Sequence, residues 1–247
     1  MKPKLEVFPS STTLAGRGAE LFLLSALNTL TFRSAFHAVL SGGRTPNEMY
    51  RAIEVHPLHA AVDWSRVHLY WGDERNVGFS SEESNFGQAW RNWLCRSIIP
   101  AGNLHPFRTE LGVEEAALEL SLALPRSLDL VFLGMGEDGH TASLFPENPW
   151  PGPESPAALA FWVPHLKSWR LSLSPAVFAR ALQVVFLVTG VTKASALRNT
   201  LQADSGSAGP ARRILDTVAE KALVLADTDA ASLLPDELRI GLTRPAA

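Results

Sequence analysis

Short apolar runs alternate along this chain with segments of helical periodicity, and this alternation restricts the fold more than any other feature. The runs carry apolar residues on both faces and read FHAVL at 36–40, VHLYW at 67–71, DLVFL at 129–133, QVVFLV at 183–188 and ALVLA at 222–226. Strands buried on both faces are typical of a parallel sheet that helices cover on each side. The pattern predicts an α/β fold, a doubly wound and mostly parallel sheet in a Rossmann-like three-layer sandwich.

The remaining elements follow from the same periods. Apolar residues at three- and four-residue steps predict a helix over residues 12–30. Two more strands are expected near residue 7 and over 170–174, and further helices from about Pro46, over 84–98 and 114–124, from Lys193, over 211–220 and after Asp227. The stretches 146–156 and 202–210 predict loops. We expect one domain over residues 1–247, with a small lobe or loop insertion around 146–168 as an option.

Composition narrows the class of protein. The chain has 247 residues, 46% of them hydrophobic, and a net charge of −3, which gives no general attraction to nucleic acid or to an anionic membrane surface. The apolar run at 21–27 is far shorter than the ~20 residues of a membrane span, and the first residues lack the apolar core of a signal peptide. The single cysteine, Cys95, excludes an internal disulfide and is expected to be buried. A cytoplasmic protein is predicted.

Polar, glycine-containing loops follow four of the predicted strands. They read SGGRTP at 41–46, GDER at 72–75, GMGEDGH at 134–140 and TGVTK at 189–193. The carboxyl ends of parallel strands lie at one edge of a sheet, and doubly wound folds bind ligands there, near the point where the strand order reverses. The four loops are therefore expected to meet in one pocket.

The first of these loops has the features of an anion site. Gly42 and Gly43 allow backbone amides to approach a ligand closely, and the helix that follows directs its positive end the same way. Arg44 adds a guanidinium at this place. An ordinary strand-to-helix turn would have the same sequence, and no Gly-Lys-Ser/Thr follows as in a P-loop. The loop alone leaves both readings open.

Charged and polar residues in the other loops also have two readings each. Arg75 follows an apolar strand that draws it inward, so it needs an anionic partner, either Asp73 or a substrate phosphate. Lys193 begins a helix, where a cation opposes the helix dipole unless an anion lies between them; the alternative is an exposed lysine. Asn85 opens another helix, as its cap or as a ligand.

The segment 134–140 contains the spacing G-x-G-x-x-G at Gly134, Gly136 and Gly139. A dinucleotide loop requires a long helix after the third glycine, but prolines at 146, 149, 151, 153 and 156 limit any helix here to about two turns. The segment is better explained as a turn that presents His140 at the end of a strand, with Asp138 placed to orient the imidazole. His140 is the one histidine of seven that lies in such a cluster of polar residues and glycines.

Two other kinds of catalytic site are not indicated. The sequence has no G-x-S-x-G nucleophile elbow, which argues against a serine hydrolase. It also lacks the His and Cys spacings of a zinc site, so no metal is predicted.

Together, the four loops resemble the 6-phosphogluconolactonases of the oxidative pentose phosphate pathway. Members of that family carry SGG-x-TP, matched at 41–46, and GDER followed by SN, matched at 72–75 and 84–85. They carry G-x-G-x-DGH-x-ASLFP, matched at 134–146, and R-x-(T/S) with a later G-x-x-K, matched at 170–172 and 190–193. The matches keep the order of the family and span most of the chain.

The resemblance implies a metal-free esterase without a cofactor that acts on a sugar-phosphate lactone, in the fold of the sugar-phosphate isomerase/deaminase group. Carried over position by position, His140 resembles the general base and Asp73 an active-site acid, while Arg75 and Lys193 resemble the phosphate-binding cations. Such an enzyme needs no nucleic acid or membrane partner, and a monomer is expected, with a dimer as the alternative.

Five more positions are carried over as substrate-binding residues. Gly42, Gly43 and Arg44 stand where the family has its phosphate loop, and Asn85 and Arg170 stand in the matched SN and R-x-(T/S) segments. Arg44 occupies a position where many members have serine or threonine.

Two other functions compete with this one. A glucosamine-6-phosphate deaminase-like isomerase resembles the chain at DGH but continues with an FNEP-type sequence, whereas this chain continues with ASLFP. A non-catalytic sugar-phosphate sensor would keep the phosphate loops without needing His140, and no DNA-binding segment is attached here.

Overall fold

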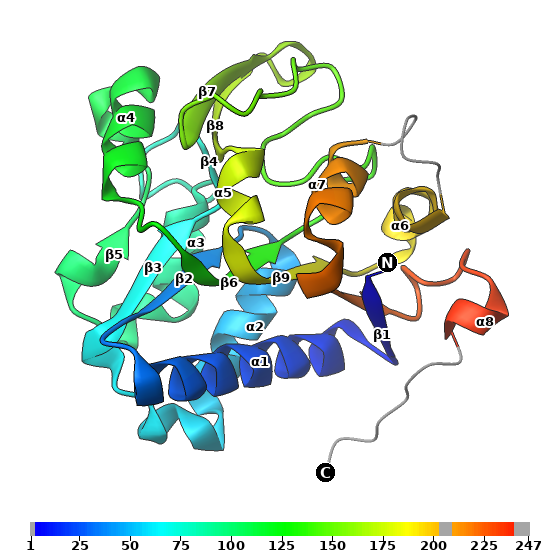
Figure 1. The fold of residues 1–247 in the computed structure, drawn as a ribbon, viewed down its shortest axis with the longest axis horizontal. Coiled ribbons are helices and arrows are strands. Elements are labelled where there is room, and N and C mark those ends of the chain that lie inside the picture. The colour runs from blue at the N-terminus through cyan, green and yellow to red at the C-terminus, as the bar shows by residue number, and fades with distance from the viewer. Residues whose placement is uncertain (1–2, 203–208, 240–247) are drawn as a thin grey trace.

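The computed structural model describes residues 3–202 and 209–239. These residues form a central sheet with helices on both of its faces and a smaller sheet at one side (Figure 1). Most of the predicted loop at 202–210 lies outside the described residues. None of the helices in the described part of the chain is both long enough and apolar enough to cross a membrane.

The central sheet has seven strands, and all of its neighbouring pairs are parallel. Their spatial order is β1 (Lys4–Phe8), β10 (Ala222–Asp227), β9 (Ala181–Val188), β6 (Leu128–Leu133), β2 (Phe36–Leu40), β3 (Val67–Trp71) and β5 (Leu104–His105). The predicted α/β fold is confirmed. From β2 the chain proceeds outward through β3 and β5, and it then returns to the other side of β2 as β6. The strand order therefore reverses between β2 and β6.

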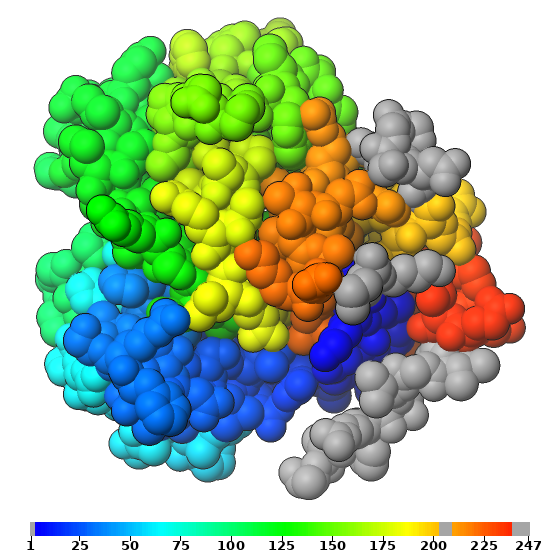
Figure 2. Space-filling model, viewed as in Figure 1, coloured from blue at the N-terminus to red at the C-terminus, as the bar shows by residue number. Residues whose placement is uncertain are grey.

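Helices cover both faces of this sheet. The helices are α1 (Ser11–Phe32), α2 (Arg44–Val55), α3 (Asn85–Asn92), α4 (Val113–Ala123), α5 (Pro175–Ala179), α6 (Ala194–Gln202), α7 (Pro210–Val218) and α8 (Asp236–Arg239). Helices α1 and α2 pack together below the sheet in Figure 1, and α5 and α7 pack together above it. In the space-filling view, the orange side chains of α7 fill the space beside the yellow ones of α5 (Figure 2).

A second, antiparallel sheet has the order β4 (Asp73–Arg75), β8 (Ser168–Leu173) and β7 (Ala158–Val163). The predicted strand at 170–174 thus exists, but it belongs to this sheet. Gly72 joins the two sheets, because its N–H donates to Leu40 of β2 and its carbonyl accepts from Leu173 of β8. The small sheet therefore begins directly where β3 ends.

The structure corrects the prediction around Cys95. The helix predicted over 84–98 ends at Asn92, and the side chain of Trp93 is fully buried at φ −153° and ψ −60°, outside helical geometry. The indole of Trp93 packs against Phe22 and Tyr50, so the chain turns there. A short 3-10 turn follows and leaves Cys95 exposed, so the expectation of a buried thiol is wrong.

Candidate active site

A cavity of about 440 Å³ opens where the carboxyl ends of the central strands meet, at the point where their order reverses. All four predicted loops contribute to its lining, which includes Gly42, Gly43, Arg44, Asp73, Arg75, Asn85, His140 and Lys193. Asp138 and Arg170, also predicted as site residues, are not part of that lining. Parallel strands thus bring together side chains that lie far apart in the sequence.

The turn after β6 holds His140 through a set of local contacts. Nδ1 of His140 lies 2.6 Å from Oδ1 of Asp138, which also accepts from the backbone N–H of His140. The turn is closed by Gly136, whose N–H donates to the His140 carbonyl at 2.8 Å, and by Gly139 at φ +79°, where glycine is favoured. The ring packs on Phe145 with 4.4 Å between centroids. With Nδ1 facing Asp138, Nε2 is the nitrogen left for a ligand.

The carboxylate of Asp138 is held in its charged form. Burial alone would raise the pKa of Asp138, but the hydrogen bonds and charge interaction with His140 more than offset this effect and lower the pKa. Asp138 contacts a neighbouring cavity of about 660 Å³ on its other side. Its contact with a residue that lines the first cavity is the one to His140.

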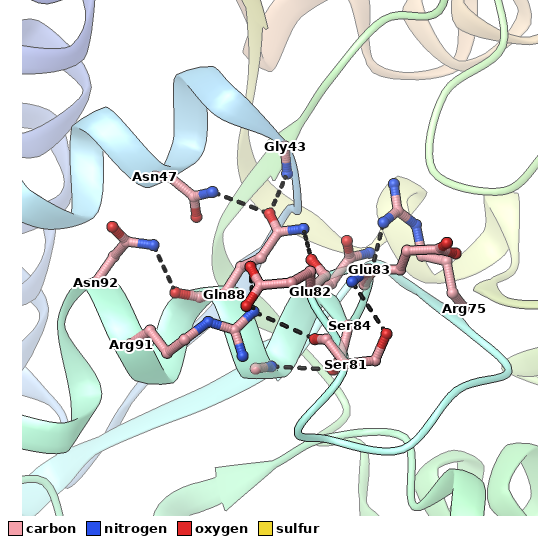
Figure 3. Close-up of polar contacts among 12 residues, drawn as sticks. Gly43, Asn47, Arg75, Ser81, Glu82, Glu83, Ser84, Gln88, Arg91 and Asn92 are labelled. Atoms are coloured by element: carbon pink, nitrogen blue, oxygen red, sulfur yellow. Dashed lines mark hydrogen bonds and ion pairs between the residues drawn. The ribbon is translucent and has the colours of Figure 1, made fainter.

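Asp73, Arg75 and Asn85 form one wall of the cavity. The two oxygens of the Asp73 carboxylate accept from Asn85 Nδ2 at 3.1 Å and from Ser143 Oγ at 2.8 Å. Arg75 donates through Nη1 to the carbonyl of Glu83 (Figure 3). Arg170 lies opposite Arg75 in the small sheet and donates to Ser168 and to the carbonyl of Trp169. Burial, followed by the charge of Arg75, lowers the pKa of Arg170.

The SGGRTP loop places the beginning of α2 at the cavity. Gly43 adopts φ +104° and precedes the first residue of α2, and no side chain within the described residues caps this helix. The Gly43 N–H donates to Oε1 of Gln88 at 3.3 Å, and the same oxygen accepts from Asn47 (Figure 3). Gln88 therefore fixes the loop against α3, and it already occupies the Gly43 amide.

Lys193 reaches the cavity from the loop after β9. Gly190, at φ +90°, donates its N–H to both oxygens of Asp227 at 3.0 Å. A buried hydroxyl pair at 2.6 Å, Thr45 and Thr189, joins this loop to the start of α2. Nζ of Lys193 lies 3.7 Å from a carboxylate oxygen of Glu137, and the Glu137 side chain is 64% exposed. A pair so exposed holds the lysine only weakly.

Sequence reasoning missed several residues that support this site. Ser143 and Gln88 contact the predicted residues Asp73 and Gly43 from elements far away in the chain, while Asp227 and the Thr45–Thr189 pair hold the loops that carry Lys193 and Arg44. Ser143, Thr45 and Thr189 lie in motifs named above, but nothing in the sequence indicated the partners of their hydroxyl groups. Across residues 3–202 and 209–239, no three His, Cys, Asp or Glu side chains are grouped so that they could hold a metal ion.

Comparisons with known proteins agree with this architecture. The model of a family described as glucosamine-6-phosphate isomerases/6-phosphogluconolactonase matches residues 9–224. The 6-phosphogluconolactonase of Haemophilus influenzae is 34% identical over 197 residues, which cover 77% of this chain and 82% of that protein. That of Nostoc is 39% identical over 157 residues, covering 59% and 64%. The solved structure of 6-phosphogluconolactonase from Trypanosoma brucei has a TM-score of 0.82 at 25% identity, covering 95% of this chain and 99% of that one.

Proposed function

The chain belongs to the family of glucosamine-6-phosphate isomerases and 6-phosphogluconolactonases, and from this membership we propose that it hydrolyses 6-phospho-D-glucono-1,5-lactone to 6-phospho-D-gluconate in the oxidative pentose phosphate pathway. One observation carries the proposal. A single cavity holds a histidine oriented by a carboxylate together with three cations, Arg44, Arg75 and Lys193, that come from separate loops. A phosphorylated lactone needs a base at its carbonyl and cations at its phosphate.

The cations and the start of α2 account for binding of the phosphate. Helix N-termini attract anions through their free N–H groups and their dipole, and α2 begins at the cavity without a side-chain cap from any described residue. The guanidinium of Arg75 donates to the backbone carbonyl of Glu83, and Lys193 has a weak ion pair, so both can turn to a phosphate. Binding the remote phosphate then orients the lactone toward His140, an effect worth several kcal/mol.

His140 acts as the general base in this proposal. The oxygen of a water molecule bonds to C1 of the lactone while Nε2 of His140 takes one of its protons. The tetrahedral oxyanion collapses, the bond between C1 and the ring oxygen breaks, and the ring oxygen takes the proton from the imidazolium. Asp138 keeps the ring oriented and stabilises its charged form. General base catalysis of this kind contributes roughly 10²–10⁴-fold.

The other predicted residues take supporting roles. The carboxylate of Asp73 is fixed by Asn85 and Ser143 and faces the cavity, so it accepts hydrogen bonds from hydroxyl groups of the sugar. Backbone amides of the glycine loops, among them that of Gly42, are the candidate donors to the oxyanion. Arg170 contributes indirectly, because its positive charge lies beside that of Arg75 and favours an anion there.

The test follows the disappearance of freshly generated 6-phosphogluconolactone above its spontaneous rate. We expect the wild-type protein to accelerate hydrolysis and His140→Ala to lose about 10²–10⁴-fold in kcat. His165→Ala is the matched control, because His165 also pairs with a carboxylate, that of Glu147, but does not line the cavity. A wild-type protein that leaves the spontaneous rate unchanged would exclude the lactonase function.

The competing functions predict other outcomes in the same experiment. A deaminase-like isomerase would release ammonia from glucosamine 6-phosphate and leave the lactone untouched. A sensor would bind 6-phosphogluconate without hydrolysing the lactone. If His140→Ala keeps full activity, the lactonase function stands but His140 is not the general base.

A further inference from the structure

Glu74 is a carboxylate with no exposed surface, located between two residues of the cavity wall. One of its oxygens accepts the N–H groups of Arg75 at 2.8 Å and Asn85 at 2.7 Å. The other accepts the N–H of Phe86 at 2.9 Å and the hydroxyl of Ser84 at 3.1 Å. Four donors thus surround one side chain, and none of them is a cationic side chain.

This arrangement attaches α3 to β4. Helix α3 begins at Asn85, and its first two N–H groups, those of Asn85 and Phe86, both bind Glu74. The third, that of Gly87, binds Ser84 Oγ at 3.0 Å. A helix N-terminus favours a negative group, and here the N–H groups at the start of α3 already bind side chains of the protein itself. The negative group is Glu74, and its hydrogen bonds fix the distance between α3 and β4.

The attachment determines where three groups of the cavity lie. Side chains alternate along a strand, so Glu74 points inward while its neighbours Asp73 and Arg75 point to the opposite side, where the cavity is. Asn85, positioned by its own N–H on Glu74, places its Nδ2 on the carbonyl and carboxylate of Asp73 at 2.9 and 3.1 Å.

Helix α3 also reaches the second wall of the cavity. Gln88 lies one turn after Asn85 and holds the Gly43 N–H and the Asn47 side chain through the same oxygen, as Figure 3 shows. A displacement of α3 would therefore move the glycine loop together with Asp73. One buried carboxylate thus controls the relative position of both walls.

We infer that Glu74 is a positioning residue of the active site, which fixes α3 against β4 so that Asp73, Arg75 and Asn85 face the substrate in one geometry. This inference rests on the proposed function for its kinetic readout. Glu74 does not touch the cavity and takes no part in the chemistry. Burial raises the pKa of Glu74, and the backbone hydrogen bonds from Phe86, Asn85 and Arg75 act in the opposite direction.

Glu74→Gln is the direct test, because the amide keeps the shape and replaces one acceptor oxygen by a donor that faces an N–H group. Asp129→Asn is the matched control. Asp129 is also buried, accepting from Arg33 at 2.6 Å and from the His37 N–H at 2.8 Å, but it lies near the amino end of β6, at the opposite edge of the sheet. Both variants are measured for thermal unfolding and, well below the unfolding transition, for kcat and KM.

We expect Glu74→Gln to lose about 10- to 100-fold in kcat/KM on the phosphorylated lactone, since a misplacement of about 1 Å can cost 10²-fold. Asp129→Asn should stay within about twofold of the wild type, whatever its loss of thermal stability. A Glu74→Gln variant that also stays within twofold, or an equal kinetic loss in Asp129→Asn, overturns the inference. If Glu74→Gln does not fold, Ser84→Ala serves instead, because it removes one of the four donors to Glu74. Its kcat/KM should fall about 3- to 10-fold, and an unchanged kcat/KM overturns the inference.

Binding separates this inference from the proposed function. Calorimetric titration with 6-phosphogluconate is made on the same variants. If the wild-type protein does not hydrolyse the lactone, the proposed function fails, and Glu74 is then judged by this titration alone. We expect at least about fivefold weaker binding in Glu74→Gln than in Asp129→Asn, and equal binding in the two variants overturns the positioning role.

Discussion

Replacing Gly136 by alanine should lower kcat without affecting the fold elsewhere. A Cβ atom at this position would lie 2.0 Å from Nδ1 of His140 and 2.6 Å from Oδ1 of Asp138, distances that atoms in proteins do not adopt. The backbone of the turn cannot yield, because the Gly136 N–H is bonded to the His140 carbonyl and the Gly139 N–H to the Gly136 carbonyl. The imidazole must therefore leave Asp138.

The magnitude follows from the contact that is lost. A hydrogen bond between a carboxylate and an imidazole is worth about 1.5–3 kcal/mol. At about 1.36 kcal/mol per tenfold change in rate, kcat should fall about 10- to 150-fold. KM for the phosphorylated lactone should change little, because Arg44, Arg75 and Lys193 belong to other loops.

The assay is steady-state hydrolysis of freshly generated lactone, corrected for the spontaneous rate. Gly16→Ala is the control, since an added Cβ on this residue of α1 meets no atom within 4 Å. It should retain wild-type kcat and KM. A folded Gly136→Ala protein with kcat within twofold of the wild type would refute the reasoning that the His140–Asp138 contact carries catalysis.

Two further predictions concern the phosphate and the response to acid. Arg75→Ala and Lys193→Ala should raise KM about 10-fold or more for the phosphorylated lactone and hardly change turnover of unphosphorylated gluconolactone, and equal losses on both substrates would contradict their role. Burial, then the charges of His68 and His37, lowers the pKa of His105 to about 4, so the unfolded chain takes up this proton first as the pH falls from about 6.5 and stability is lost toward pH 4. The full shift in pKa corresponds to about 3 kcal/mol of folding free energy, which the partial exposure of His105 reduces to ~1–2 kcal/mol. In urea unfolding, His105→Phe should therefore lose less free energy of unfolding between neutral pH and pH 5 than the wild type. An equal loss in both proteins would contradict this cause.

The strands of the central sheet were the most predictable part of the fold. Strands β2 and β3 have the predicted bounds, because a strand buried on both faces leaves an unmistakable apolar run. In the small sheet only β8 was predicted. Its strand β4 has three residues, all of them charged, and β7 was not predicted at all. Both strands are stabilised by pairing with β8: β4 across almost 100 positions of sequence, and β7 across the short turn that follows it.

Eight of the ten predicted site residues line one cavity, for a topological reason that can be read from the sequence. Each loop follows a parallel strand, so its position in space depends on strand order and not on its own composition. The contacts that orient the side chains could not be predicted in the same way. Ser143 donates to Asp73 across 70 positions of sequence, and the choice of hydroxyl or carboxylate partner depends on packing at the level of single atoms.

The spacing G-x-G-x-x-G illustrates how the same glycines can serve a different purpose. In a dinucleotide loop, the third glycine opens a helix whose N-terminus receives the pyrophosphate. Here Gly139 reverses the chain at φ +79°, and an isolated bridge between Thr141 and Leu144 follows in place of a helix. The helix that approaches this turn is α7, whose Ala211 N–H donates to the Gly139 carbonyl at 2.9 Å. The positive end of that helix is thus directed at the carbonyl of the turn, and Gly136 makes room for the ring of His140.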